Sequence, residues 1–171
     1  VGTVSSLVFV YAINYMQGEI RYTFFFTSLT LFAGSMLVLV SSPTLLQLLI
    51  GWELVGVCSY LLIGHYWEKK ENSSAAMKAF ITNKIADIGL MIGIIVLALS
   101  TKTLRISEIL YQSTHDYEDI KTVAYLGGVL LFIGAMGKSA QFPLHFWLPD
   151  AIAGPTPVSA LIHAATMVTA G

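Results

Sequence analysis

Lys138 is the residue whose chemical type and setting most directly suggest chemistry. It stands in GAMGKSAQFPLHFWLPDA, at the end of a long apolar run and five residues before Pro143. A lysine at the centre of a membrane-spanning helix costs roughly 2.5 to 3.5 kcal/mol on insertion scales, so it is retained where it meets a partner, a water-filled cavity or a function. This placement predicts ion movement through a membrane.

Glu53 is the expected partner of Lys138. It follows Thr44 by nine residues in a second apolar stretch, which places it about 14 Å along a helix and near the middle of the membrane. An isolated carboxylate there would take up a proton, whereas a nearby ammonium keeps it ionised. We therefore expect Glu53 to face Lys138 and to form a pair whose separation releases a proton. The alternative is a static clasp between two helices.

Asp87 and His163 are the next candidates for a proton path. Asp87 shares a helix face with Asn83 and Lys84, so it forms either a local ion pair or a functional acid near Glu53 and Lys138. His163 lies two turns into a polar-flecked helix, where an imidazole suits a proton relay. A hydrogen bond to a neighbouring helix is the alternative for His163.

The segment that carries Lys138 is expected to be interrupted. Its apolar run, residues 122–136, is too short to cross a bilayer. Pro143 lacks a backbone donor and disfavours helix at the residue before it, and a short second helical stretch follows. These features predict a discontinuous transmembrane helix around Lys138 to Pro143.

An interrupted helix in a membrane leaves backbone groups that need partners. Such backbone is tolerated only where it is buried in protein or lines a watery cavity, and in transporters it marks the ion pathway. Ser139, Gln141 and His145 lie around the predicted break. They are candidates for pairing with the freed backbone groups or for holding water.

The composition is that of an integral membrane protein. Of 171 residues, 56% are hydrophobic and 11% charged, and the mean hydropathy is +0.74. Nine basic and ten acidic residues nearly cancel, which excludes nucleic-acid binding. Cys58 is the sole cysteine, and HExxH, GxGxxG and Walker motifs do not occur, so no cofactor, metal site or catalytic triad is expected in this chain.

The pattern of apolar stretches predicts one all-α membrane domain over residues 1–171, built as a polytopic helical bundle. About six spans are expected, the first and last truncated, with an extramembrane loop at about 101–121. The chain is interpreted as a piece of a longer one or as part of a split subunit, and basic residues do not predict its orientation. The expected spans are residues 1–16, 22–40, 44–63, 77–99 and 122–153, with a sixth opening near 157.

Three stretches resemble a known family. GWELVGVCSYLLIG, FITNKIADIGL and above all GAMGKSAQFPLHFWLPDAIAGPTPVSALIHAATMVTAG are similar to the subunit 5 family of NADH dehydrogenase, the antiporter-like subunits of respiratory complex I. The resemblance covers residues 18–171 and implies an antiporter-like fold with a discontinuous lysine-bearing helix. It also implies that Glu53 and Lys138 match the family's buried pair, Asp87 its acid on the following helix and His163 its histidine after the break.

The same resemblance implies a function and a setting. The chain would be a proton-translocating membrane subunit of NADH:ubiquinone reductase, with NADH, FMN, iron–sulfur clusters and quinone bound by partner subunits. Its surroundings would be the lipid bilayer and other membrane subunits of complex I, in the mitochondrial inner membrane or, alternatively, a bacterial plasma membrane. Two other functions stay open: a subunit of a multisubunit cation/proton antiporter, and a helical scaffold that does not pump.

Overall fold

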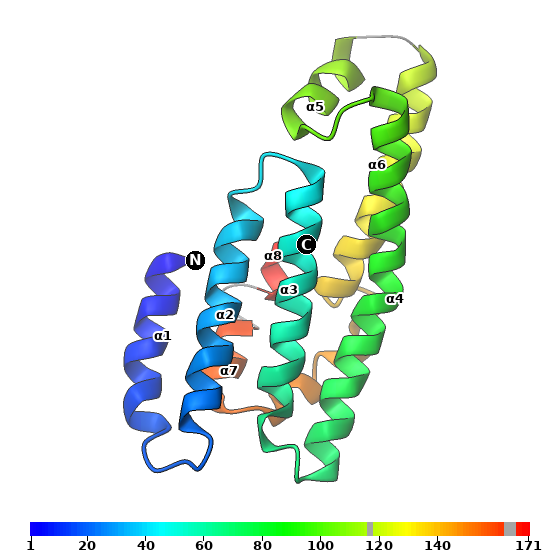
Figure 1. The fold of residues 1–171 in the computed structure, drawn as a ribbon. Coiled ribbons are helices and arrows are strands. Elements are labelled where there is room, and N and C mark those ends of the chain that lie inside the picture. The colour runs from blue at the N-terminus through cyan, green and yellow to red at the C-terminus, as the bar shows by residue number, and fades with distance from the viewer. Residues whose placement is uncertain (116–117, 163–166) are drawn as a thin grey trace.

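The computed structural model describes residues 1–115, 118–162 and 167–171, and these residues form helices and no strands. Figure 1 shows the long helices standing side by side, with short helical pieces of the C-terminal part packed behind them. The elements in chain order are α1 Gly2–Tyr15, α2 Tyr22–Val40, α3 Leu45–Ile63, η1 Gly64–Tyr66, α4 Lys70–Thr101, α5 Ile106–His115, α6 Glu118–Lys138, η2 His145–Trp147, η3 Asp150–Ala153, α7 Thr156–Ala160 and α8 Met167–Ala170.

Three helical segments of the described chain are long and apolar enough to cross a membrane. They are Tyr22–Val40, Leu45–Tyr66 and Lys70–Thr101, with mean hydropathies of 1.9, 1.8 and 1.9. α4 has 32 residues, so it is about 48 Å long and exceeds the hydrocarbon core of a bilayer. The predicted all-α membrane bundle is confirmed, while the count of about six spans stays a prediction.

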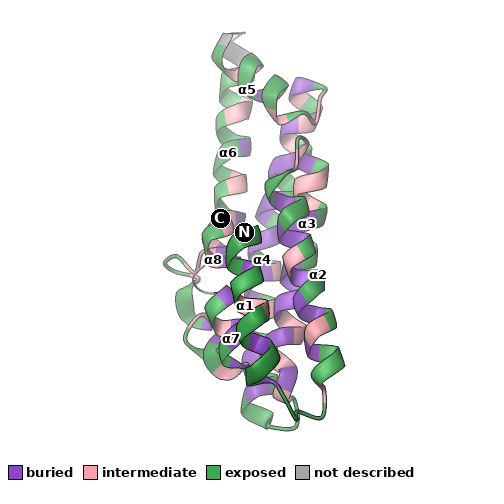
Figure 2. Ribbon diagram, turned by 90° about the vertical axis from the view of Figure 1, so that its left-hand side faces the viewer, coloured by how far each residue is buried: buried purple, intermediate pink, exposed green. Residues whose placement is uncertain are grey.

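The buried face of each helix points into the bundle. Figure 2 shows buried residues where the helices face one another and exposed residues on the outer surfaces. Many of these outer residues are large and apolar, among them Leu7, Val10 and Leu99, which are 67%, 65% and 76% exposed. Apolar side chains on the outside are expected where lipid, rather than water, surrounds the helices.

The break after Lys138 is confirmed, and its details differ from the expectation. α6 has 21 residues and begins at Glu118, so it extends beyond the apolar run of residues 122–136, but it is not among the three segments that are both long and apolar enough to cross a membrane. It ends at Lys138, and Ala140 follows with a positive φ of 48°. The expected second helical stretch consists of the short 3-10 helices η2 and η3.

The connector of residues 101–121 is not a simple loop, which corrects the sequence-based expectation. It contains α5, whose Ile109 is 7% exposed and belongs to the core. Two backbone hydrogen bonds join it to the start of α3: Leu45 N–H donates to Leu104 O at 2.9 Å, and Ile106 N–H donates to Pro43 O at 3.1 Å. Its mixed charges concealed a helix with an apolar side that packs against the bundle.

Glycines allow α4 and α6 to approach closely, and these two helices pack together more extensively than other pairs in the described structure. A Cβ added at Gly93 would lie 2.9 Å from Gly127 O, and one at Gly134 would lie 2.6 Å from Leu90 Cβ. A Cβ at Gly137 would collide with Cβ of Ala86. Helix association in membranes depends on such close packing, because lipid offers no hydrophobic driving force.

Replacing Gly93 by alanine is expected to weaken the contact between α4 and α6. The added methyl group would meet backbone, and overpacking of this kind costs about 1 to 3 kcal/mol. The melting temperature of the full-length protein in detergent should therefore fall. Gly128→Ala is the matched control, because nothing lies within 4 Å of its added Cβ. Equal melting temperatures for the two variants would contradict the close packing.

Candidate functional site

Lys138 lies at the C-terminal end of α6 and is completely buried. Its Nζ donates a hydrogen bond to the backbone oxygen of Trp52 on α3 at 3.0 Å. The same Nζ lies 5.3 Å from the centroid of the Trp52 ring, within the range of a cation–π interaction. Gly56 leaves room for this approach, because a Cβ there would lie 3.0 Å from Nζ.

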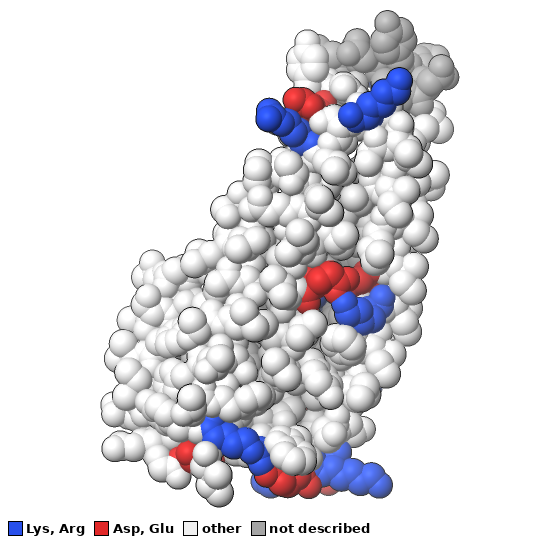
Figure 3. All heavy atoms as spheres, in the orientation of Figure 1, with Lys and Arg blue, Asp and Glu red and all other residues white. Residues whose placement is uncertain are grey.

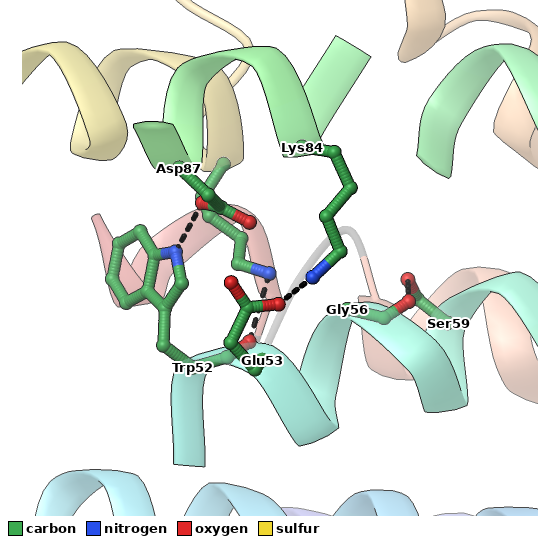
Figure 4. Close-up of polar contacts among 7 residues, drawn as sticks. Trp52, Glu53, Gly56, Ser59, Lys84 and Asp87 are labelled. Atoms are coloured by element: carbon green, nitrogen blue, oxygen red, sulfur yellow. Dashed lines mark hydrogen bonds and ion pairs between the residues drawn. The ribbon is translucent and has the colours of Figure 1, made fainter. Parts of the chain in front are cut away.

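Asp87 on α4 supplies the negative charge of the buried site. It is 2% exposed, and its Oδ1 accepts a hydrogen bond of 2.6 Å from Nε1–H of Trp52. The Asp87 carboxylate and the Lys138 ammonium attract each other electrostatically. Figure 4 shows the Trp52 side chain reaching from α3 to Asp87. A lysine, an aspartate and a tryptophan from three helices therefore form one buried cluster.

Glu53 forms its ion pair with Lys84 and not with Lys138, which corrects the predicted pairing. The side chains of Lys84 and Glu53 are 37% and 28% exposed, so this pair is nearer the surface than Lys138. Figure 3 shows acidic and basic side chains gathered midway along the molecule, with uncharged surface between them and the charged side chains at its two ends. Lys84 takes the position expected for Lys138, because it projects from α4 toward the neighbouring turn of α3 (Figure 4).

The two groups of charges are adjacent in the structure. Trp52 and Glu53 are consecutive on α3, and Lys84 and Asp87 are three residues apart on α4, so each helix contributes to both groups from a single turn. Asp87 interacts electrostatically with Lys138 and also with Lys84, whose ion pair is formed with Glu53.

Two residues of the site were missed by sequence reasoning. Trp52 was overlooked because tryptophan is common in apolar helices, although its position directly before Glu53 was a signal. Asn83 was noted only as a neighbour of Asp87. It is 3% exposed, its Nδ2 donates to Ala79 O at 2.9 Å, and its Oδ1 is buried without a hydrogen-bond partner among the described residues. A free buried acceptor one turn from Asp87 is a place for a water or a protonated group.

The residues predicted around the break are more exposed than the buried cluster. Gln141, Pro143 and His145 are exposed, and Ser139 is half-buried. The His145 ring stacks on Phe142 with the ring centroids 5.9 Å apart. His163 lies outside the described residues.

The backbone freed by the break is paired by other groups. Trp147 donates from Nε1 to Gly137 O at 3.0 Å, and Gln141 N–H donates to Met136 O at 2.9 Å. The peptide bond between Phe142 and Pro143 is cis. The side chains of Ser139, Gln141 and His145 are therefore not what pairs with these two carbonyl groups.

Within residues 1–115, 118–162 and 167–171, no group of three or more His, Cys, Asp or Glu side chains could hold a metal ion. The buried cluster contains one cation, one anion and an indole donor instead. What it can do is bind a proton, hold it and release it within the protein.

The comparisons assign this helical membrane bundle, with its buried lysine at a helix break, to the class of antiporter-like membrane subunits. Residues 42–171 match the family described as "NADH:quinone oxidoreductase/Mrp antiporter, TM", and the chain belongs to that family. In a solved structure, that of the Mrp complex from Dietzia, one chain superposes with a TM-score of 0.88 and 32% identity over 98% of this chain and 18% of its own length.

Among individual proteins, the chain is similar to subunit 5 of NAD(P)H-quinone oxidoreductase, so the resemblance to that subunit family is confirmed. It is 50% identical to the chloroplastic subunit of Acorus calamus over 99% of this chain. It is 49% identical to chain 5 of the enzyme of Synechocystis over 100% of this chain. These matches cover 23% and 26% of the two relatives, so the chain spans about a quarter of their length.

A double-mutant cycle on thermal stability would check the observed charge pairing. Glu53→Gln and Lys84→Met should be strongly non-additive in the full-length protein, with an interaction energy of about 0.5 to 3 kcal/mol, because each removes the partner of the other. Glu53→Gln and Lys138→Met should be closer to additive, since these two side chains do not form an ion pair in the structure. Non-additivity for Glu53 with Lys138, and additivity for Glu53 with Lys84, would instead support the pair of Glu53 and Lys138 that was predicted from the sequence.

Proposed function

We propose that this chain is part of a proton-translocating membrane subunit of NAD(P)H:quinone oxidoreductase. The single observation that carries the proposal is the complete burial of Lys138 at a helix break, beside Asp87 and with its Nζ on Trp52 O. A buried ionisable group in a membrane protein with a nearby counter-charge is a hallmark of proton pathways. Family membership and the similarity to subunit 5 support the same assignment.

The cluster suits reversible protonation of Lys138. As an ammonium, Lys138 is stabilised by the Asp87 carboxylate and by the face of the Trp52 ring. As a neutral amine it would lose both attractions but would still donate N–H to Trp52 O. The lysine can thus change its charge without losing its position. A change in the negative charge around it would decide whether the proton stays or leaves.

The pair formed by Glu53 and Lys84 offers a neighbouring source of such a change. If Glu53 and Lys84 separated, an unpaired carboxylate or ammonium would lie next to the buried cluster. This charge would change the electrostatic potential at Lys138. We propose that Glu53, Asp87 and Lys138 act in proton transfer, with His163 as a further candidate from the sequence. The proposed pathway includes four further residues only because they form the helix break: His145, Ser139, Gln141 and Pro143.

The energy for proton movement would come from partner subunits. NADH, FMN, iron–sulfur clusters and quinone are expected there, and other membrane subunits are expected beside this one in the bilayer. The chain is a membrane protein of the complex I family. The relatives reported above are chloroplastic and cyanobacterial, so they do not support the expectation of a mitochondrial inner membrane. We propose that the chain lies in an energy-transducing membrane of a chloroplast or a bacterium, which includes the bacterial alternative given above.

A subunit of a multisubunit cation/proton antiporter is the second candidate, favoured by the similarity to a chain of the Mrp complex. The two functions differ in their partners. Co-purification with iron–sulfur subunits that oxidise NAD(P)H would support the oxidoreductase, and sodium-dependent proton exchange without NAD(P)H would support the antiporter. A scaffold that does not pump would show changes of assembly, and none of transport, when its charges are removed.

The proposal is tested by counting the protons translocated per NAD(P)H oxidised in sealed membrane vesicles that contain the full-length chain in its complex. Lys138→Ala should lower this ratio while the amount of assembled complex stays normal, because the proton-carrying group is gone. Lys78→Ala is the control, since Lys78 is half-exposed and pairs with Asp150 away from the cluster. An unchanged ratio for Lys138→Ala would overturn the proposal.

A further inference from the structure

Trp52 contacts both of the buried charged side chains. Its indole N–H donates to Asp87 Oδ1 at 2.6 Å, and its backbone oxygen accepts from Lys138 Nζ at 3.0 Å. It is 4% exposed, which places these contacts out of reach of bulk solvent. The residue therefore connects an acid on α4 with a base on α6, although it carries no charge itself.

The two contacts of Trp52 use different chemistry. A carbonyl oxygen has two lone pairs, so Trp52 O can serve the helical bond to Gly56 N–H within α3 and Lys138 at the same time. The absence of a side chain at Gly56 makes room for the ammonium beside that carbonyl. The indole nitrogen, in contrast, is a donor only and has no free lone pair. Trp52 can orient a carboxylate, but it cannot accept a proton from Lys138 or pass one on.

The indole N–H of Trp52 matters because the Asp87 carboxylate is only 2% exposed and has little contact with water. A buried carboxylate without a donor tends to take up a proton, which would remove the counter-charge of Lys138. A short N–H bond to Oδ1 favours the ionised form and holds it on the side of α4 that faces α3 and α6. The carboxylate then keeps its place while Lys138 is neutral, ready for the ammonium to form again.

We infer that Trp52 is a positioning residue of the proton path, which holds the Asp87 carboxylate beside Lys138 through its indole N–H. The inference rests on the proposed function and extends it to a residue without charge. Among the described residues, the charged groups around Asp87 are Lys84 on its own helix, Lys138 on α6, and Glu53 on α3 through its pair with Lys84.

The test is the pH profile of NAD(P)H-driven proton translocation by the complex containing the full-length chain. Trp52→Phe keeps an aromatic ring and the backbone carbonyl and removes the N–H. Loss of a hydrogen bond to a charged group changes the pKa of that group by about one to two units. The dependence of proton translocation on pH should therefore move by about one unit to higher pH. The direction follows because a carboxylate without its donor binds a proton more readily.

Two controls separate positioning from packing. In an Asp87→Asn background, Trp52→Phe should cause no further shift, because the group that it acts through no longer titrates. Trp147→Phe also removes a buried indole donor, but one that serves a backbone carbonyl, so it should leave the pH profile in place. A Trp52→Phe variant that lowers translocation by the same factor at every pH, or shifts the Asp87→Asn profile too, would overturn the inference.

A second replacement covers the case in which Trp52→Phe fails to assemble. β-(3-Benzothienyl)alanine at position 52 keeps the two-ring shape of tryptophan and lacks the N–H, so it should give the same shift with normal packing. The comparison with Lys138→Ala keeps the two proposals apart. A lowered ratio in Lys138→Ala with an unshifted profile in the position-52 variants would overturn the role of Trp52 alone. An unchanged ratio in Lys138→Ala would overturn the proposed function itself.

Discussion

A buried ammonium needs a hydrogen-bond acceptor and a counter-charge, and the structure provides both for Lys138 from two other helices. The acceptor is the carbonyl of Trp52 on α3, and the counter-charge is Asp87 on α4. Desolvation of an ion is costly unless such partners are in place. The relative positions of α3, α4 and α6 are therefore constrained by one side chain, and other features of the bundle serve that constraint.

The contact between α4 and α6 is the clearest of these features. Ala86 and Gly137 touch, and they directly precede Asp87 and Lys138 in the sequence. Their small size sets the spacing of the two charged residues. Gly56 does the same on α3 by leaving the carbonyl of Trp52 accessible. Small residues thus have a second role here, since they define the geometry of a polar cluster as well as the distance between helices.

The helix break after Lys138 lies directly next to this polar cluster. Because α6 ends at Lys138, the chain can turn away and return through η2, whose Trp147 pairs with the carbonyl of Gly137. Irregular backbone in a membrane protein must be paired in this way or lie next to water. Two tryptophans, Trp52 and Trp147, therefore satisfy polar groups on either side of Lys138 while presenting apolar rings to the surrounding helices.

Much of the fold was predictable from the sequence. Apolar stretches of sufficient length predicted the helices Tyr22–Val40 and Leu45–Ile63 closely, and Pro143 predicted the interruption after Lys138. These signals are local, since span length and the lost donor of proline do not depend on the neighbours. The helix α5 was missed because its apolar side is short and lies among charged residues.

The sequence by itself determined that this is a helical membrane protein with ionisable groups, Glu53, Asp87 and Lys138, on its apolar segments. Only the tertiary structure decided what each one contacts: Glu53 forms an ion pair with Lys84, whereas Lys138 donates to the backbone oxygen of Trp52 and Asp87 accepts from the indole N–H of Trp52. The physical reason is that a sequence gives the position of a side chain along its own helix, whereas its partner depends on the rotation and depth of the neighbouring helix. Those are set by packing contacts such as Ala86 with Gly137, which join residues far apart in the chain.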